Sequence, residues 1–226
     1  MLELPSVSLV AVFTVEHQLT RMAAADCMRQ ANFGDVRLFG DDDGTIPGPF
    51  ATMIEGARFS LYDALRRPKT SHVLSIQYDS WIVNPSAWTD EFLEYDYIGA
   101  PWSWFPDKNV GNSGFCLRSR RLLEFLAAHR EAFPIKLPED VSLCREYRPE
   151  LERRGFRWAP VGLASRFSFE RAAYWPLNEI FGYHGMFNWP KVMTPDQIEA
   201  RMRHATSYVT ESAHYKEMRA LMASHK

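Results

Sequence analysis

Two acidic motifs in this chain could bind a cation or move a proton. In the segment QYDSW (77–81), Asp79 follows a β-branched apolar run that predicts a strand. A carboxylate at a strand end can hold a hard cation against a substrate phosphate, although a single Asp there more often closes a turn. Glu139 and Asp140 follow Pro138 at a predicted helix start, where carboxylates often only face the helix dipole. The motifs allow metal-assisted phosphate chemistry and acid–base catalysis, and neither alone specifies a reaction.

Aromatic rings and glycines supply the other candidate features. Six of the 14 residues between Phe92 and Phe105 are aromatic, and such rings suit the flat faces of sugars as well as an ordinary core. The glycines of the turn Gly111–Gly114 would let backbone amides approach a ligand closely, but a plain β-turn explains them too. His184, in FGYHG, is compatible with a hydrogen-bonded core position or with a ligand role.

Composition and missing motifs exclude several classes of protein. Of 226 residues, 46% are hydrophobic and 24% are charged, which excludes disordered and collagen-like chains. The net charge of −2 and the lack of a long basic run argue against a nucleic-acid partner. No GxSxG, GxxxxGK or GxGxxG segment occurs, so hydrolase-elbow, P-loop and dinucleotide-fold interpretations are dropped.

Cysteine usage and hydropathy predict a compartment. The three cysteines have no CxxC spacing, which argues against a disulfide framework and a structural zinc site. No apolar stretch approaches 18 residues, so no transmembrane segment is expected. We therefore expect a cytoplasmic protein, with peripheral contact at the inner membrane left open.

The acidic run Asp41–Asp43 lacks the calcium-loop pattern and is interpreted as a solvated loop.

The elements that must position these residues follow an α/β order. Strands are predicted at 7–14, 36–39 and 72–77, with helical spacing between them, including a helix over about 52–67. Such alternation predicts a Rossmann-like, mostly parallel central sheet flanked by helices. After Asp79 the pattern favours a mixed sheet.

The second half of the chain is predicted to contain two further strands, helices and a tail. The strands are expected at 96–100 and 114–117, and the helices at 119–132 and from Pro138 onward. Thr194 with Pro195 and Gln197 forms a capping-box signature that begins one or two tail helices. We predict one domain, residues 1–189, and a helical C-terminal tail, residues 190–226. The tail is expected to pack onto the domain or onto a second copy of the chain, as a homo-oligomer.

Six ordered segments together resemble a known family. They are HVLSIQYDSW (72–81), FLEYDYIGAPW (92–102), VGNSGFCLRSRRLLE (110–124), PEDVSLC (138–144), RFSFE (166–170) and FGYHG (181–185). The chain resembles an uncharacterised domain family of bacteria, with QYD, YDYIGAPW, GNGGF, EDV and FGFHG motifs, whose members are regarded as glycosyltransferases of the GT-A type. The resemblance covers roughly residues 5–187 and implies a GT-A-like single domain.

The resemblance implies a nucleotide-sugar donor and a metal ion. Gln77, Tyr78 and Asp79 would occupy the place of the DxD motif, and Asp79 with His184 would bind Mn²⁺, or Mg²⁺ in its place. The expected contacts to the nucleotide are Thr14, Glu16 and His17 beyond the first strand, and Arg58 near the phosphates. A UDP-sugar is favoured over a GDP-sugar.

The same resemblance implies a substrate pocket and a general base. Its expected sugar and acceptor contacts are Trp81, Trp102, Gly111, Asn112, Ser113 and Gly114. Asp140, with Glu139 as the second candidate, would take the proton of an acceptor hydroxyl in an inverting reaction, and retention is left open. Two departures matter, because Gln77 replaces the first Asp of a standard DxD motif and Ser113 replaces the middle Gly of GNGGF. If that Gly position requires a positive φ, Ser113 would impair transfer.

Two function classes follow from these features. The first is a metal-dependent glycosyltransferase that moves a sugar from a nucleotide-sugar to a hydroxyl of a glycan or cell-surface polysaccharide precursor. The second is a non-catalytic carbohydrate or nucleotide-sugar binding module, whose site has been degraded at Gln77 and Ser113. A metal-dependent phosphodiesterase acting on nucleotide-sugars is a third, weaker alternative.

Overall fold

A computed structural model describes residues 1–40, 42, 44–46, 48 and 50–224. Two residues of the acidic run, 41 and 43, lie outside this part, so the loop interpretation there stays a prediction. The central sheet has five strands in the order β2-β1-β3-β6-β5. Their bounds are β1 Leu2–Phe13, β2 Ala31–Gly40, β3 His72–Ile76, β5 Tyr97–Gly99 and β6 Phe115–Ser119.

The strand directions make this a mostly parallel, mixed sheet. β1 is parallel to both β2 and β3, whereas β6 is antiparallel to its neighbours β3 and β5. Four strands therefore run in one direction and β6 runs in the other. A second, small sheet has the order β4-β8-β7. Its strands are β4 Ser80–Ile82, β7 Ser168–Phe169 and β8 Gly182–His184.

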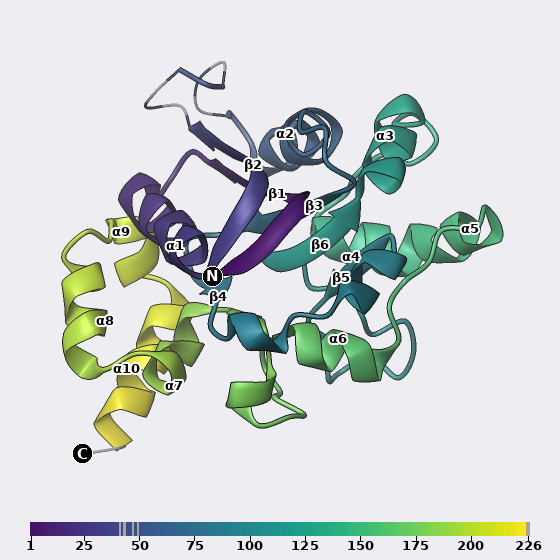
Figure 1. Cartoon of the computed structure of the whole chain (residues 1–226). Coiled ribbons are helices and arrows are strands. Elements are labelled where there is room, and N and C mark those ends of the chain that lie inside the picture. Colours follow the sequence, from purple (N-terminus) through teal and green to yellow (C-terminus); the bar gives the residue numbers. More distant parts are fainter. Residues whose placement is uncertain (41, 43, 47, 49, 225–226) are drawn as a thin grey trace.

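Helices cover both faces of the sheet (Figure 1). One core contains Leu9 and Leu74 together with apolar residues of α1, α6 and the tail. The other contains Val10 and Val73 together with residues of η1 and α3. Consecutive residues of one strand enter opposite cores because side chains alternate across a sheet. The helices before the tail are α1 His17–Gln30, α2 Met53–Phe59, η1 Ser60–Ala64, α3 Arg120–Ala128, α4 Glu139–Val141, η4 Ser142–Tyr147, α5 Arg148–Arg153 and α6 Val161–Phe167.

Local sequence explains where several elements begin and where they differ from expectation. Thr52 and Glu55 form a capping box at the start of α2. The helix predicted over 52–67 ends at Phe59 and continues as the π-helical turn η1. The segment after α4 is also π-helical, and Pro149 lies in the first turn of α5, where its missing N–H costs nothing. Short 3₁₀ turns complete the chain at η2 Pro85–Ala87, η3 Asp90–Glu94, η5 Leu177–Glu179 and η6 Met186–Asn188.

The C-terminal tail packs onto the rest of the chain. It contains more helices than the one or two expected: α7 Trp189–Val192, α8 Pro195–Met202, α9 Ser207–Thr210 and α10 Ala213–Ser224. Its residues Ile198, Val209 and Met218 are buried in the same core as α1. The predicted boundary at residue 189 therefore falls at the start of a packed helix. Packing onto the domain is observed, and oligomerisation stays a prediction.

Polar contacts fix the tail against α1. Arg201 forms an ion pair with Asp26 of α1, and its guanidinium lies 4.3 Å from the centre of the Trp81 ring. The carboxylate of Glu16 accepts hydrogen bonds from the backbone N–H of Thr206, at 3.1 and 3.2 Å, and from its hydroxyl. In the described residues, no helix combines the length and apolar character needed to cross a bilayer.

Candidate active site

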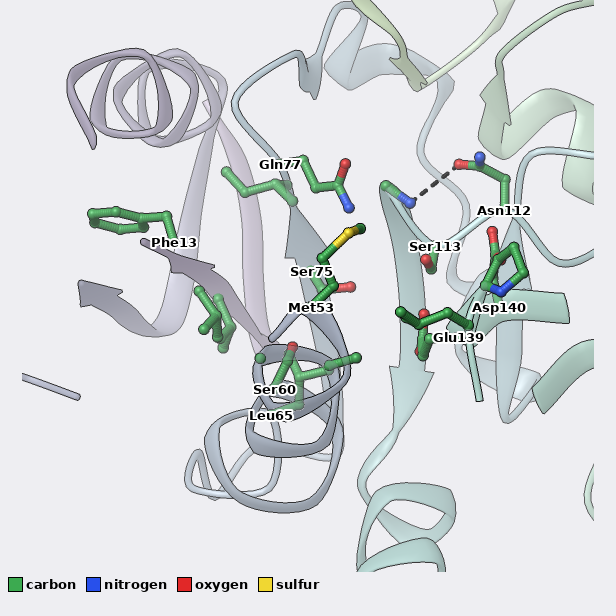
Figure 2. Close-up of a pocket in the computed structure, with 18 of the residues that line it drawn as sticks. Phe13, Met53, Ser60, Leu65, Ser75, Gln77, Asn112, Ser113, Glu139 and Asp140 are labelled. Carbon is green, nitrogen blue, oxygen red and sulfur yellow. Dashed lines mark hydrogen bonds between the residues drawn. The ribbon is translucent and has the colours of Figure 1, made fainter. Parts of the chain in front are cut away.

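A pocket of about 400 Å³ opens on the sheet face that carries Val10, Val12 and Ser75 (Figure 2). α2 and η1 form another wall, through residues that include Met53 and Ser60. Thr14 and Gln77, at the carboxyl ends of β1 and β3, also line it. Open α/β sheets bind ligands beyond these strand ends, so the position of the pocket agrees with the expectation from topology.

The pocket gathers eight of the residues predicted from sequence. They are Thr14, Gln77, Asn112, Ser113, Gly114, Glu139, Asp140 and His184. They come from five separate parts of the chain, and Figure 2 shows Gln77, Asn112, Ser113, Glu139 and Asp140 around the cavity. Their convergence is a result of the tertiary fold, since no local pattern places them side by side.

Hydrogen bonds hold the turn before β6 in place. The Oδ1 atom of Asn112 accepts a hydrogen bond from the N–H of Gly114 at 3.2 Å. The carbonyl oxygen of Gly114 accepts from the N–H of Gln77 at 3.1 Å and from the hydroxyl of Ser80 at 2.7 Å. Among the described non-glycine residues, Glu16 and Lys108 are those with positive φ. Ser113 therefore needs no left-handed conformation, and its departure from the family glycine imposes no backbone strain.

Gly114 is required by the close approach of His184. A Cβ atom at position 114 would lie 2.2 Å from the Nε2 atom of the imidazole, a distance that forces the ring to move. The structure gives this glycine a packing reason, and its expected substrate contact stays a prediction.

Replacing Gly114 with Ala is expected to displace His184 and to lower the free energy of unfolding by about 1–3 kcal/mol, as overpacking does. Gly162→Ala is the matched control, because no atom lies within 4 Å of the added Cβ in α6. That change should be neutral or slightly stabilising. Urea denaturation and the ¹⁵N resonances of the imidazole report the two effects. A Gly114→Ala chain with wild-type stability and an unmoved imidazole would contradict the clash.

His184 lies between two carboxylates. Its Nε2 atom is 3.5 Å from Oδ1 of Asp79, and its Nδ1 atom is 3.3 Å from Oε1 of Glu170. Burial opposes charging of the imidazole, but Asp79 and Glu170 more than offset this and raise the pKa of His184. The N–H of Met186 donates to Oδ2 of Asp79 at 3.0 Å. Oδ1 of Asp79 is buried, and no other residue of the described structure offers it a hydrogen bond.

Asp79 and His184 could supply part of a coordination shell. Oε1 of Gln77 lies 3.2 Å from Nε2 of His184. Two ligands of one ion bound at about 2.1 Å are roughly 3–3.4 Å apart. The Gln77–His184 separation lies in this range, and the 3.5 Å between Asp79 and His184 is slightly longer. Within the described ranges, no group of three or more His, Cys, Asp and Glu residues is arranged for a metal ion. A bound ion would thus need oxygen ligands from a substrate or from water.

Glu139 and Asp140 differ in their surroundings although they are adjacent. Oε1 of Glu139 accepts a hydrogen bond from Nη2 of Arg118 at 2.8 Å. Asp140 accepts from the N–H of Val141 at 2.8 Å through Oδ1. Burial, followed by the charge of Glu139, raises the pKa of Asp140 to about 6. Asp140 has the properties of a general base near neutral pH, while Glu139 is held in an ion pair.

Several predicted nucleotide contacts lie outside the pocket. Glu16 is buried and bonded to Thr206 of the tail, and Nδ1 of His17 is 3.6 Å from Oδ2 of Asp42. Arg58 lines a different cavity, of about 520 Å³, against η1. Tyr78 is partly buried against the core that contains α1, and this burial raises its pKa. Their role in nucleotide binding stays a prediction that the geometry of the pocket does not support.

The predicted aromatic sugar contacts are core residues. Trp81 packs edge-on against Tyr183, with ring centres 4.8 Å apart, and Trp102 packs against Phe105 at 5.3 Å. Gly111 is buried beneath Trp102, whose ring a Cβ atom would meet at 2.3 Å. Asp79 is also absent from the lining itself, since it is buried beside His184, which does line the pocket.

Two site residues were not anticipated, namely Arg118 and Glu170. Arg118 lines the pocket from near the end of β6. The sequence feature that could have identified Arg118 is its charge directly after the apolar run FCL. Glu170 ends RFSFE, one of the ordered segments that carry the family resemblance, and the resemblance assigned this acid no role. Sequence spacing gave no indication that it would contact a histidine 14 positions later.

Comparisons with known proteins support the fold. A family model described as a protein of unknown function (DUF5672) matches residues 57–184. A solved glycosyltransferase involved in glycosylation of the major capsid of PBCV-1 is 12% identical, with a TM-score of 0.53 over 88% of this chain and 98% of that chain. The galactosyltransferase LgtC is 12% identical, with a TM-score of 0.43 over 86% and 99%, a likeness too low to use further. No curated protein sequence matches the chain. The expected GT-A-like α/β fold is confirmed.

Proposed function

The chain belongs to the DUF5672 family, and we propose that it is a metal-dependent glycosyltransferase. It would transfer a sugar from a nucleotide-sugar to a hydroxyl of a glycan or polysaccharide precursor, with inversion. The observation that carries the proposal is Asp140, a carboxylate with a raised pKa that faces a pocket at the carboxyl ends of β1 and β3. The shared fold with a solved glycosyltransferase supports it.

The pocket has one uncharged end and one end rich in polar groups. Val10, Val12 and Phe13 provide apolar surface for a nucleotide base. Asp79 and His184, with the amide of Gln77, would hold a divalent cation, which would neutralise charge on the diphosphate leaving group. Imidazole ligation favours Mn²⁺ over Mg²⁺.

Asp140 performs the proton transfer in this proposal. Its carboxylate takes the proton of the acceptor hydroxyl as the acceptor oxygen bonds to the anomeric carbon. The bond from that carbon to phosphate oxygen breaks, and its electron pair leaves with the nucleotide diphosphate. A base with a pKa of about 6 is largely ionised at pH 7 and can still accept a proton.

Thermal unfolding with nucleotides and Mn²⁺ tests donor binding. At 100 times its Kd a ligand adds about 2.7 kcal/mol of stability, which is roughly 5–10 °C for a chain of this size. We expect this shift with one nucleotide diphosphate, UDP being tested first, and only in the presence of Mn²⁺. Asp79→Asn should abolish the shift, whereas Asp196→Asn, at an exposed position in α8, should preserve it. The lack of a shift with UDP, GDP, CMP and dTDP compounds would contradict the proposal.

A non-catalytic binding module is the second candidate, favoured because the described residues contain no group of three or more His, Cys, Asp and Glu arranged for a metal ion. The two functions differ in their products. A transferase forms a glycoside, a binding module consumes no donor, and a phosphodiesterase releases free sugar phosphate. Product analysis with the donor identified by thermal unfolding therefore separates all three.

A further inference from the structure

Arg118 is a buried cation in the middle of the central sheet. It lies on β6, between β3 and β5, and 2% of its surface is exposed. Nη1 donates to the hydroxyl of Ser75 at 3.2 Å, and Nη2 donates to Glu139 at 2.8 Å. The guanidinium also lies 5.3 Å from the centre of the Tyr97 ring. Its Nε atom is buried, with no hydrogen-bond acceptor among the residues described.

Stability alone does not account for this arrangement. Removing two charges from water costs several kcal/mol per ion, and apolar residues of similar size often replace a buried ion pair without loss of stability. Here the pair is incompletely satisfied, because no acceptor in the described part of the chain lies at Nε. Its anionic partner is Glu139, the direct neighbour of Asp140 at the pocket wall. The geometry therefore connects the sheet to the proposed base.

We propose that Arg118 is a positioning residue that binds Glu139 as a fixed counter-ion and so leaves Asp140 as the carboxylate available to the acceptor hydroxyl. This inference rests on the proposed function. The Arg118 guanidinium anchors the one-turn helix α4 to β6, and it prevents Glu139 from competing with Asp140 for the acceptor proton. Glu139 thereby serves as a structural anion and not as the base.

Charged groups on every neighbouring element act on Asp140. Glu139 on α4 and Glu170 after β7 raise its pKa, while Arg118 on β6 lowers it. His184 on β8 interacts electrostatically with the same carboxylate. Without Arg118, the charge of Glu139 would be uncompensated and the two carboxyl groups would share a proton.

Carboxyl ¹³C NMR of the full-length chain labelled at Asp tests this coupling without any substrate. The Asp140 resonance is identified by its loss in Asp140→Asn. We expect its titration midpoint to rise by roughly one pH unit in Arg118→Met and to fall by roughly one unit in Glu139→Gln. Arg118→Lys, which retains the charge, should restore the wild-type midpoint. If Arg118→Met fails to fold, Glu139→Gln and Arg118→Lys decide the question. An Asp140 midpoint that is the same as in wild type in whichever of Arg118→Met and Glu139→Gln fold overturns the proposal.

Kinetics with the identified donor provide the second readout. Arg118→Met should lower kcat on the order of 10²-fold through misplacement of the base, with little change in the donor KM, and the pH profile should move with the Asp140 midpoint. An active Arg118→Met chain with unchanged kcat and pH profile overturns the role of Arg118 alone. If wild type forms no glycoside from any nucleotide-sugar, the proposed function fails, and the role of Arg118 in that reaction fails with it.

Discussion

Asp140→Asn is expected to lower the turnover of glycosyl transfer by about 10²–10⁴-fold, the usual contribution of a general base. Donor affinity should be retained, because Asn keeps the shape of the side chain and can still accept the hydrogen bond from Val141. Turnover is measured by glycoside formation, and affinity by the Mn²⁺-dependent thermal shift. Asp196→Asn is the control, since Asp196 is exposed on α8. A fully active Asp140→Asn chain would remove Asp140 from the mechanism.

The same substitution has an expected signature in stability. The folded-state pKa of Asp140, about 6, lies above the ordinary value of about 3.9. Wild type therefore loses stability as the pH rises from about 4 to about 6, and the full loss is present above that range. Asn cannot ionise, so Asp140→Asn should be more stable than wild type at pH 8, by about 2–3 kcal/mol. The two proteins should unfold together at pH 4.

The activity of wild type should also depend on the ionisation of Asp140, but it should increase with pH where stability decreases. Transfer requires the ionised carboxylate, so kcat should increase with pH through about 6 and then level off. A stability difference between the two proteins that does not depend on pH would show that Asp140 is not desolvated in the folded chain. A midpoint of kcat near 4 would lead to the same conclusion.

Removal of residues 194–226 is expected to unfold the chain at ordinary temperature. Ile198, Val209 and Met218 are almost fully buried in the core shared with α1. Each contributes about 1.5–3 kcal/mol by burial. The deletion also removes Arg201, the ion-pair partner of Asp26. The sum is comparable to the 5–15 kcal/mol that stabilises a typical domain. Circular dichroism on heating should show no cooperative transition.

Two adjacent residues of α9 provide a milder test of the same packing. Val209 is fully buried, whereas 57% of Tyr208 is exposed. Val209→Asp places a carboxylate in the core and should cost several kcal/mol, while Tyr208→Asp should leave the unfolding temperature nearly unchanged. A truncated chain that stays soluble, with unchanged oligomeric state and unfolding temperature, would contradict this account of the tail.

Much of the fold could be predicted because it depends on local periodicity. The continuous apolar run at residues 7–14 requires a strand covered on both faces, and it becomes part of the interior strand β1. The capping signature at Thr194 begins α8 as expected. The sequence pattern also places a turn directly before the predicted strand at 114–117 and the acidic pair 139–140 at a helix start, as observed at β6 and α4. These features are specified by residues within a few positions of one another.

Other features depend on contacts between distant segments. Trp81 and Trp102 are suited by type to sugar binding, yet packing places them in the core. Glu16 follows the first strand as a nucleotide contact would. Its carboxylate instead accepts hydrogen bonds from Thr206, 190 residues later. Neither outcome can be read from spacing, because burial is decided by which elements meet.

The distinction between Glu139 and Asp140 shows this most clearly. Sequence offers two neighbouring carboxylates at a helix start, with nothing local to distinguish their charge states. The fold brings Arg118 from β6 to one of them and leaves the other desolvated at a pocket wall. Residue types and periodicity thus specify the sheet and the chemical groups. Three-dimensional packing decides which group is neutralised and which is poised to react, since electrostatic interactions act over ångströms in space and not over positions in the chain.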